Sequence, residues 1–215
     1  MPRPKGDAQE RLLEAARALA LERGCGALCV REVCRRSRVN LGLFHYHFKS
    51  KDAFIKRVLE DVYAEFFAEL SKAAEESGPV LARLRGALRV IALFAREHRR
   101  LFVGLLRDAV NGNKLTLEFA ASRFPHHLPL VMGLIRDGVR DGRLRDLPEP
   151  VLLSVLMGAI SVPALMFTLL EDAGAKLPFG KSMSEVEKDL LSDRSIELRL
   201  DLALAALKSP SRRGR

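Results

Sequence analysis

The sequence predicts an all-α protein of about nine helices, with a three-helix N-terminal domain ahead of a larger helical C-terminal domain. Apolar residues recur at helical spacing through most of the 215 residues, and no sustained alternating run of β-branched residues marks a strand. Apolar residues make up 48% of the chain and charged residues 29%, a balance typical of a globular protein rather than a disordered one.

Two amphipathic helices are expected near the N-terminus. The first covers residues 7–23, where apolar residues share one face and Gly24 follows as a stop signal. The second covers residues 30–37, and the tight turn Ser37-Arg38-Val39 follows it.

A third, short helix is expected in NLGLFHYHFKSKD, residues 40–52. Phe44 and Phe48 lie four residues apart and should anchor this helix to the core, which leaves the intervening histidines and tyrosine more exposed. Ser50 is a candidate N-cap for a long helix of about 51–76, which connects the two domains.

The C-terminal domain is expected to be helical as well. The motif PHHLP at 125–129 predicts a break within one of its helices. Residues 184–191 are either a separate turn or the start of the last helix. The expected helices cover about 79–97, 99–110, 114–142, 150–173 and 195–208.

Residues 151–170 carry no charge and are long enough to span a bilayer. The acidic flanks Glu149, Glu171 and Asp172, and the polar residues inside the run, argue against a membrane span. We therefore expect a helix that packs between the core of the protein and a dimer partner.

Positive charge is concentrated at the N-terminus. Residues 1–57 hold 13 Lys and Arg against 6 Asp and Glu, whereas residues 58–207 hold 19 against 21. A basic head on a near-neutral body indicates a polyanionic partner such as nucleic acid. The alternative is a head that is charged only for solubility.

Two short helices joined by a tight turn predict a helix-turn-helix, whose last helix enters the DNA major groove. Gly42 costs a helix about 1 kcal/mol relative to alanine, which is tolerable where another backbone must come close. Lys51 lies in the first turn of a helix, where the macrodipole disfavours a cation unless a phosphate is also bound there.

The stretch VREVCRRSRVNLGLFHYHFKSKDAF resembles the helix-turn-helix signature of the TetR-type, or tetracycline-repressor-like, transcription regulators. The resemblance covers about residues 8–57 and extends beyond them only in length and helix order. It implies a homodimeric repressor that binds a palindromic operator and releases it when a small ligand enters the C-terminal domain. The matching positions are Gly42, Tyr46, His47, Phe48, Ser50, Lys51 and Asp52.

The resemblance also implies which residues meet DNA. His45 holds the place of the family's usual tyrosine, a phosphate contact, and Lys51 matches the phosphate-binding lysine of the fourth helix. Leu41 and Leu43 hold base-reading positions, where they would rely on apolar contact with groups such as thymine methyls. The implied DNA-binding residues are Arg38, Asn40, Leu41, Gly42, Leu43, His45, Tyr46, His47 and Lys51.

Some positions depart from the family pattern. Cys29 stands where a capping Ser or Thr usually opens the second helix, and Arg38 stands in a turn that usually prefers glycine. Asn40 replaces a common serine but can still cap the third helix. These departures concern the operator sequence more than the ability to bind DNA.

The predicted domains are residues 1–50 for DNA binding and 51–208 for ligand binding and dimerisation, followed by a basic flexible tail at 209–215. Dimerisation is expected through helices 150–173 and 195–208. His126-His127 is either a solvent-facing kink or the polar lining of a ligand cavity. The candidate ligand-binding residues are Phe102, Leu106, Arg123, His126, His127, Met132, Met166 and Phe167.

Other chemistry has weaker support in the sequence. The odd set of three cysteines, Cys25, Cys29 and Cys34, gives no disulfide framework, and no apolar signal segment opens the chain. A cytoplasmic, nucleoid-associated protein is therefore expected. The cysteine spacing does not match a structural zinc site, and no catalytic motif is present, so we expect no metal, no cofactor and no enzyme. Two alternatives stay open, namely a redox-responsive regulator acting through Cys25 and Cys29, and a ligand-independent DNA-binding protein.

Overall fold

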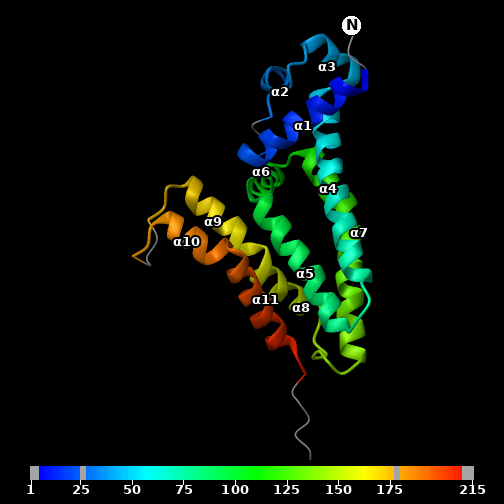
Figure 1. Cartoon of the computed structure of the whole chain (residues 1–215), viewed down its shortest axis with the longest axis vertical. Helices are drawn as coiled ribbons and strands as arrows, with labels where there is room; N and C mark the ends of the chain where they lie inside the picture. Colours follow the sequence, from blue (N-terminus) through cyan, green and yellow to red (C-terminus); the bar gives the residue numbers. More distant parts are fainter. Residues whose placement is uncertain (1–4, 25–27, 177–179, 210–215) are drawn as a thin grey trace, which may run out of the picture. The chain divides into compact units, whose positions relative to one another are not determined.

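The computed structural model describes residues 5–24, 28–176 and 180–209, which form eleven helices joined by loops (Figure 1). The predicted all-α class is confirmed, with two more helices than expected. The helices are α1 (Lys5–Arg23), α2 (Val30–Ser37), α3 (Leu41–His47), α4 (Lys51–Glu75), α5 (Val80–Glu97), α6 (Arg99–Val110), α7 (Lys114–Arg140), α8 (Glu149–Ile160), α9 (Val162–Asp172), α10 (Met183–Leu191) and α11 (Asp193–Leu207). Cys25 and the tail residues 210–215 lie outside the described residues.

Contacts within the chain define two compact units. Unit 1 comprises Met1–Glu65 and His98–Ser122, and unit 2 comprises Phe66–Glu97 and Arg123–Arg215. Helices α4 and α7 contribute residues to both units. A contact unit is not a functional domain, so the boundary at residue 50 stays a prediction.

In unit 1, helices α1, α2 and α3 pack against one another, and α1 also packs against α6. Their shared core contains an aromatic cluster, in which the ring of Phe54 lies 5.0 Å from Phe44 and 4.7 Å from Phe48 between centroids. All three rings are buried, which confirms the predicted anchoring of α3. Burial of each ring stabilises the fold by about 1.5–3 kcal/mol, so α3 is held although it is too short to be stable alone.

The predicted break at 125–129 is wrong, because α7 is one continuous helix of 27 residues. Pro125 and Pro129 each remove one backbone hydrogen bond from the helix. Downstream of them, α7 buries an apolar row that holds the helix together. That row consists of Val131, Met132, Leu134 and Ile135.

The single helix expected over 150–173 is also wrong, because the chain turns at Ser161 between α8 and α9, whose axes differ by 48°. Pro163 lies near the start of α9 and has no N–H to bond the carbonyl of Ala159, four residues earlier. No single helix among the described residues is long and apolar enough to cross a membrane, although the bent α8–α9 pair has the length and composition.

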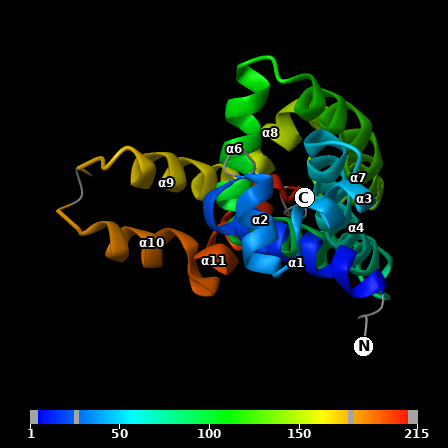
Figure 2. The same cartoon turned by 90° about the horizontal axis from the view of Figure 1, so that it is seen from above.

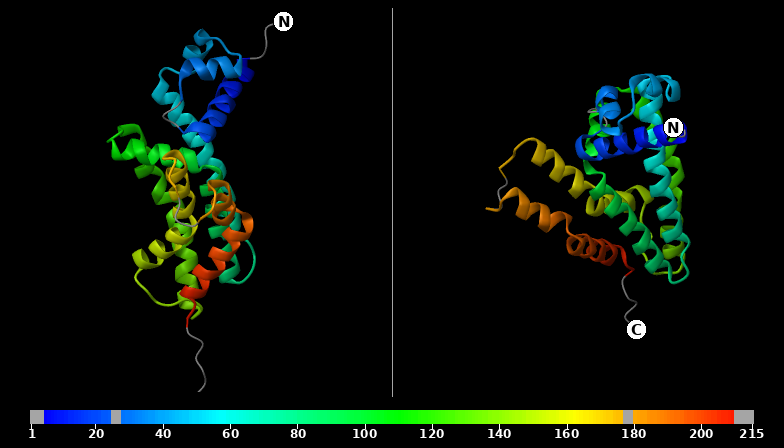
Figure 3. Two further views of the ribbon diagram at one scale, coloured as in Figure 1. Left: turned by 90° about the vertical axis from the view of Figure 1, so that its left-hand side faces the viewer. Right: turned by 45° about the horizontal axis from the view of Figure 1, so that its top comes forward.

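In unit 2, α9 and α10 lie side by side as a two-helix arm (Figures 2 and 3). Phe167 of α9 packs against Val186 and Leu191 in the core of this arm. Ser182 caps α10 in a reciprocal capping box with Glu185, which explains why 183–191 forms a helix of its own. Helix α11 returns along α8 and α5.

Candidate nucleic-acid interface

The turn between α2 and α3 is set by Arg38, whose backbone is left-handed with φ 55° and ψ 37°. Two backbone hydrogen bonds close this turn, from the N–H of Arg38 to Arg35 O and from the N–H of Val39 to Cys34 O. Val39 is buried and holds the turn against the core. An arginine in this conformation is strained by roughly 1–2 kcal/mol compared with glycine, so its side chain is a candidate for a role outside the fold.

Helix α3 begins at a side-chain cap, since Asn40 Oδ1 accepts from the N–H of Leu43 at 2.8 Å. A Cβ atom added to Gly42 would lie 3.3 Å from that same oxygen, so glycine leaves room for the cap. The Asn40 cap therefore explains a glycine at position 42 without any need for DNA to approach the backbone there. Asn40 also caps as the sequence predicted.

The outer face of α3 is open to solvent. Leu41 is 43% exposed, Leu43 37% and Tyr46 66%, whereas Phe44 on the inner face is completely buried. His45 is exposed next to Tyr46. These adjacent exposed aliphatic and aromatic side chains make this face a candidate contact surface.

His47 is placed differently from its neighbours. Its ring is half-buried and contacts Tyr46 and Phe48 at centroid distances of 5.2 Å and 6.4 Å. Its Nε2 is buried and has no hydrogen-bond partner among the described residues. This nitrogen of His47 therefore meets a group outside the protein only after the ring turns.

Helix α4 begins beside this face. Ser50 Oγ accepts from the N–H of Ala53 at 3.1 Å and so caps the helix as predicted, and Lys51 follows it, exposed. Arg35 and Arg36 are paired, with Glu32 and Glu22 respectively, each at 2.6 Å. For Arg38 and Lys51, by contrast, no ion pair is present in the part of the chain that the structure describes. Their charges are therefore available to an anion.

Lys49 was missing from the sequence-based set. It is exposed between α3 and α4, close in sequence to Lys51, and it also has no ion pair within the described ranges. The sequence could have pointed to Lys49, because it directly follows the buried Phe48. Phe48 anchors the chain to the core, and this keeps the next residue close to α3.

The two described cysteines differ in environment. Cys29 is exposed at the N-cap of α2, where the backbone N–H groups of Glu32 and Arg31 lower the pKa of its thiol, with a smaller contribution from the charge of Lys51. Burial raises the pKa of the Cys34 thiol. Among the described residues, no group of three or more His, Cys, Asp or Glu side chains is arranged to hold a metal ion.

The candidate ligand residues are spread over both units. Phe102 and Leu106 belong to unit 1, and Leu106 is exposed on α6. The other six belong to unit 2. There, Met132 is buried on α7, Met166 is exposed on α9, and Phe167 is committed to the core of the α9–α10 arm.

The histidine pair of α7 is split by the helix. His126 is exposed, whereas His127 is half-buried, with its ring 5.6 Å from that of Phe66. Burial lowers the pKa of His127, and the Arg123 carbonyl, which accepts from the imidazole, opposes this shift. The structure thus brings His127 and Arg123 together and leaves His126 in solvent, and the ligand pocket as a whole stays a prediction.

Comparisons with known proteins agree with this interface. The family model described as "Bacterial regulatory proteins, tetR family" matches residues 12–58, which cover most of α1, all of α2 and α3, and the start of α4. The HTH-type transcriptional repressor KstR2 of Mycolicibacterium smegmatis is 25% identical over 146 residues, 67% of this chain and 71% of that protein. The HTH-type transcriptional repressor Rv3405c of Mycobacterium tuberculosis is 34% identical over 92 residues, 39% of this chain and 49% of that protein.

Solved structures show the same fold over nearly the whole chain. The reduced form of NemR from E. coli has a TM-score of 0.65 at 19% identity, covering 95% of this chain and all of that one. GusR from Salmonella enterica has a TM-score of 0.64 at 16% identity, covering 96% and 98%. With the helix-turn-helix geometry and the family model in agreement, residues 12–58 of this chain are a helix-turn-helix domain of the TetR family of bacterial transcriptional regulators.

Proposed function

We propose that this protein is a repressor that binds a palindromic operator as a homodimer and releases it when a small molecule binds its C-terminal domain. The observation that carries the proposal is the exposed face of α3, which Phe44 anchors from behind. It is flanked by the cations Arg38 and Lys51, which have no ion pair within the described residues. Relatives that are named as repressors support the sign of regulation.

On this proposal, the contacts divide into two kinds. Lys51, His45 and Arg38 meet phosphates, which positions α3 without reading sequence. Leu41, Leu43 and Tyr46 face base edges, and the two leucines read thymine methyl groups by apolar contact. An operator rich in thymine at the positions nearest the start of α3 follows from this division.

Dimerisation would use apolar rows that unit 2 leaves exposed. Helices α8, α9 and α11 each bury one face and keep large apolar side chains on another, at a spacing of four residues. Such rows are a common feature of subunit interfaces. They consist of Val151 and Val155 on α8, Val162 and Met166 on α9, and Leu198 and Leu202 on α11.

The dimer provides the regulatory mechanism. Two recognition helices must lie about 34–36 Å apart to occupy successive major grooves on one side of the duplex. A ligand that binds a dimer with a different spacing more tightly lowers DNA affinity by its differential affinity for the two states.

Selection from random duplexes, followed by footprinting, tests the proposal. We expect one protected palindrome, and light scattering should give a dimer at micromolar concentration. Leu202→Glu should yield a folded monomer with weakened operator binding. Lys72→Glu, an exposed change on α4, is the control and should remain a dimer. Diffuse protection, or a monomer with and without DNA, would contradict the proposal.

A redox-responsive regulator is a second candidate, and the exposed Cys29 with its lowered pKa favours it. The thiolate is the form that oxidants attack, and it lies where α2 supports the recognition helix. Hydrogen peroxide should then weaken operator binding by the parent protein and leave Cys29→Ser unaffected. Equal loss in both proteins would exclude Cys29 as the sensor.

A further inference from the structure

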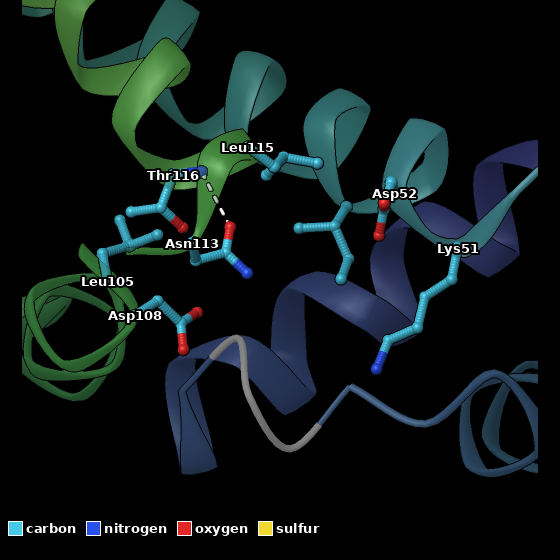
Figure 4. Close-up of a pocket in the computed structure, with 8 residues that line it drawn as sticks. Lys51, Asp52, Leu105, Asp108, Asn113, Leu115 and Thr116 are labelled. Carbon is cyan, nitrogen blue, oxygen red and sulfur yellow. Dashed lines mark hydrogen bonds between the residues drawn. The ribbon is translucent and has the colours of Figure 1, made fainter. Parts of the chain in front are cut away.

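Unit 1 contains a cavity of about 240 Å³, and of its lining residues only Lys51 has a role in the functions proposed above (Figure 4). It lies between the first turns of α4, the end of α6 and the start of α7. Its volume is below the roughly 300–1,000 Å³ of sites for drug-sized ligands, so it suits a molecule of about the size of an amino acid.

The charged lining of the cavity carries both signs. Lys51 lies at one side, Asp108 lies at the other, and Asp52 adds a second carboxylate (Figure 4). No ion pair joins any of these three side chains to another group in the ranges that the structure describes. The cavity therefore presents unneutralised charges of both signs, with one more negative than positive.

Two of these charges lie at the unfavourable ends of their helices. Lys51 is the first residue of α4, where the macrodipole disfavours a cation, and Asp108 is in the last turn of α6, where it disfavours a carboxylate. Neither placement helps its own helix. A charge that conflicts with local structure and has no partner is a sign of a site.

The remaining lining is apolar apart from one amide and one hydroxyl. Ile55, Leu105 and Leu115 supply aliphatic surface. Asn113 Oδ1 accepts from the N–H of Thr116 at 3.1 Å, which fixes the amide as the cap of α7. Its nitrogen then points away from Thr116 and toward the cavity (Figure 4).

We infer that this cavity binds a small aliphatic zwitterion, of which an ω-amino acid is the simplest form. Its ammonium group pairs with Asp108, its carboxylate pairs with Lys51, and its methylene chain lies on Ile55, Leu105 and Leu115. A simple anion is disfavoured by the two carboxylates, and a diamine is disfavoured by Lys51. The residues that line this cavity include none of the candidate ligand-binding residues named above.

Occupancy of the cavity would act on DNA through Lys51. A ligand carboxylate that holds the ammonium group competes with the DNA phosphate, so ligand and DNA each weaken the binding of the other by the same factor. This coupling rests on the proposed DNA contact of Lys51, whereas the binding of the zwitterion does not.

Calorimetry of the full chain without DNA tests the site. The probes are 5-aminopentanoate, pentylamine and pentanoate, which share one chain length and differ in their charged ends. We expect affinity in the order zwitterion, amine, carboxylate. Asp108→Asn should weaken zwitterion binding at least tenfold, and Asp141→Asn, an exposed change in unit 2, should not. No heat from the zwitterion up to ~10 mM, or equal binding by Asp108→Asn, overturns the inference.

Fluorescence anisotropy with a non-specific duplex at low salt tests the coupling. 5-Aminopentanoate should weaken DNA binding by the parent protein and leave Asp108→Asn unaffected, with thermal unfolding showing both proteins folded. If the zwitterion binds and the DNA affinity is unchanged, the coupling is overturned. If the protein binds no DNA at all, the proposed function fails, and the calorimetric result still decides the site.

Discussion

Arg199 supplies the hydrogen bond that Pro163 cannot make. Pro163 has no N–H for the carbonyl of Ala159, and Nε of Arg199 on α11 donates to that oxygen at 2.8 Å. The same guanidinium donates through Nη1 to the carbonyl of Leu190, near the end of α10. One side chain thus satisfies carbonyls near the ends of two helices, α8 and α10.

The first prediction is that the two residues are energetically coupled. Arg199→Met leaves the Ala159 carbonyl without this donor and should lower the free energy of unfolding by about 2 kcal/mol. With Pro163→Ala, the N–H of residue 163 can bond that carbonyl, so Arg199→Met should cost about 1 kcal/mol less. Urea denaturation of the four proteins measures the cycle. Arg194→Met, an exposed change on the same helix, should be nearly neutral, and additive effects would exclude the coupling.

Local patterns in the sequence predicted the helices whose ends are set locally. The bounds of α2 and α6 agree with the expected 30–37 and 99–110, since apolar spacing and neighbouring stop signals determine them. The burial of Phe44 and the caps at Asn40 and Ser50 were predicted for the same reason.

The wrong predictions concern features that depend on residues distant in the sequence. Pro163 was visible in the uncharged run, but the donor that satisfies the carbonyl it leaves free is Arg199, which no window around Pro163 contains. Conversely, the prolines of α7 were expected to break a helix that is continuous, with an apolar row buried further along it. The cavity beside Lys51 was missed because its lining comes from three helices whose packing no local pattern gives.

The second prediction concerns Lys51. If its ammonium group neutralises one phosphate, Lys51→Ala should weaken binding to all duplexes and reduce the slope of log K against log salt by about one. Anisotropy titrations at several salt concentrations measure this slope. Lys72→Ala, at the far end of the same helix, is the control and should keep the parent slope. An unchanged slope for Lys51→Ala would rule out the phosphate contact.

The third prediction separates strain from function at Arg38. Arg38→Gly relieves the left-handed backbone and should raise the free energy of unfolding by up to about 1 kcal/mol, while it weakens DNA binding through the lost charge. Arg38→Ala removes the same charge without relieving the strain, so it should lose DNA affinity equally and gain no stability. Denaturation and anisotropy give the two quantities, and unchanged DNA affinity in both variants would remove Arg38 from the interface.

The fourth prediction uses the pH dependence of Cys29. Its pKa is lowered first by the backbone N–H groups of Glu32 and Arg31 and then by Lys51. In a Cys25→Ser, Cys34→Ser background, the rate of alkylation by iodoacetamide should therefore rise with a midpoint below that of an ordinary thiol. Lys51→Ala should move that midpoint upward.

The sign of the linked stability follows from the same shift. Because folding lowers the pKa of Cys29, the thiolate stabilises the folded state above the pKa of the unfolded thiol, and this stabilisation is lost as the pH falls through the folded value. Cys29→Ser should therefore flatten the rise of stability with pH in that window, as measured by urea denaturation across alkaline pH. A midpoint for alkylation at or above that of a free thiol would contradict the lowered pKa, and with it the reason to regard Cys29 as reactive.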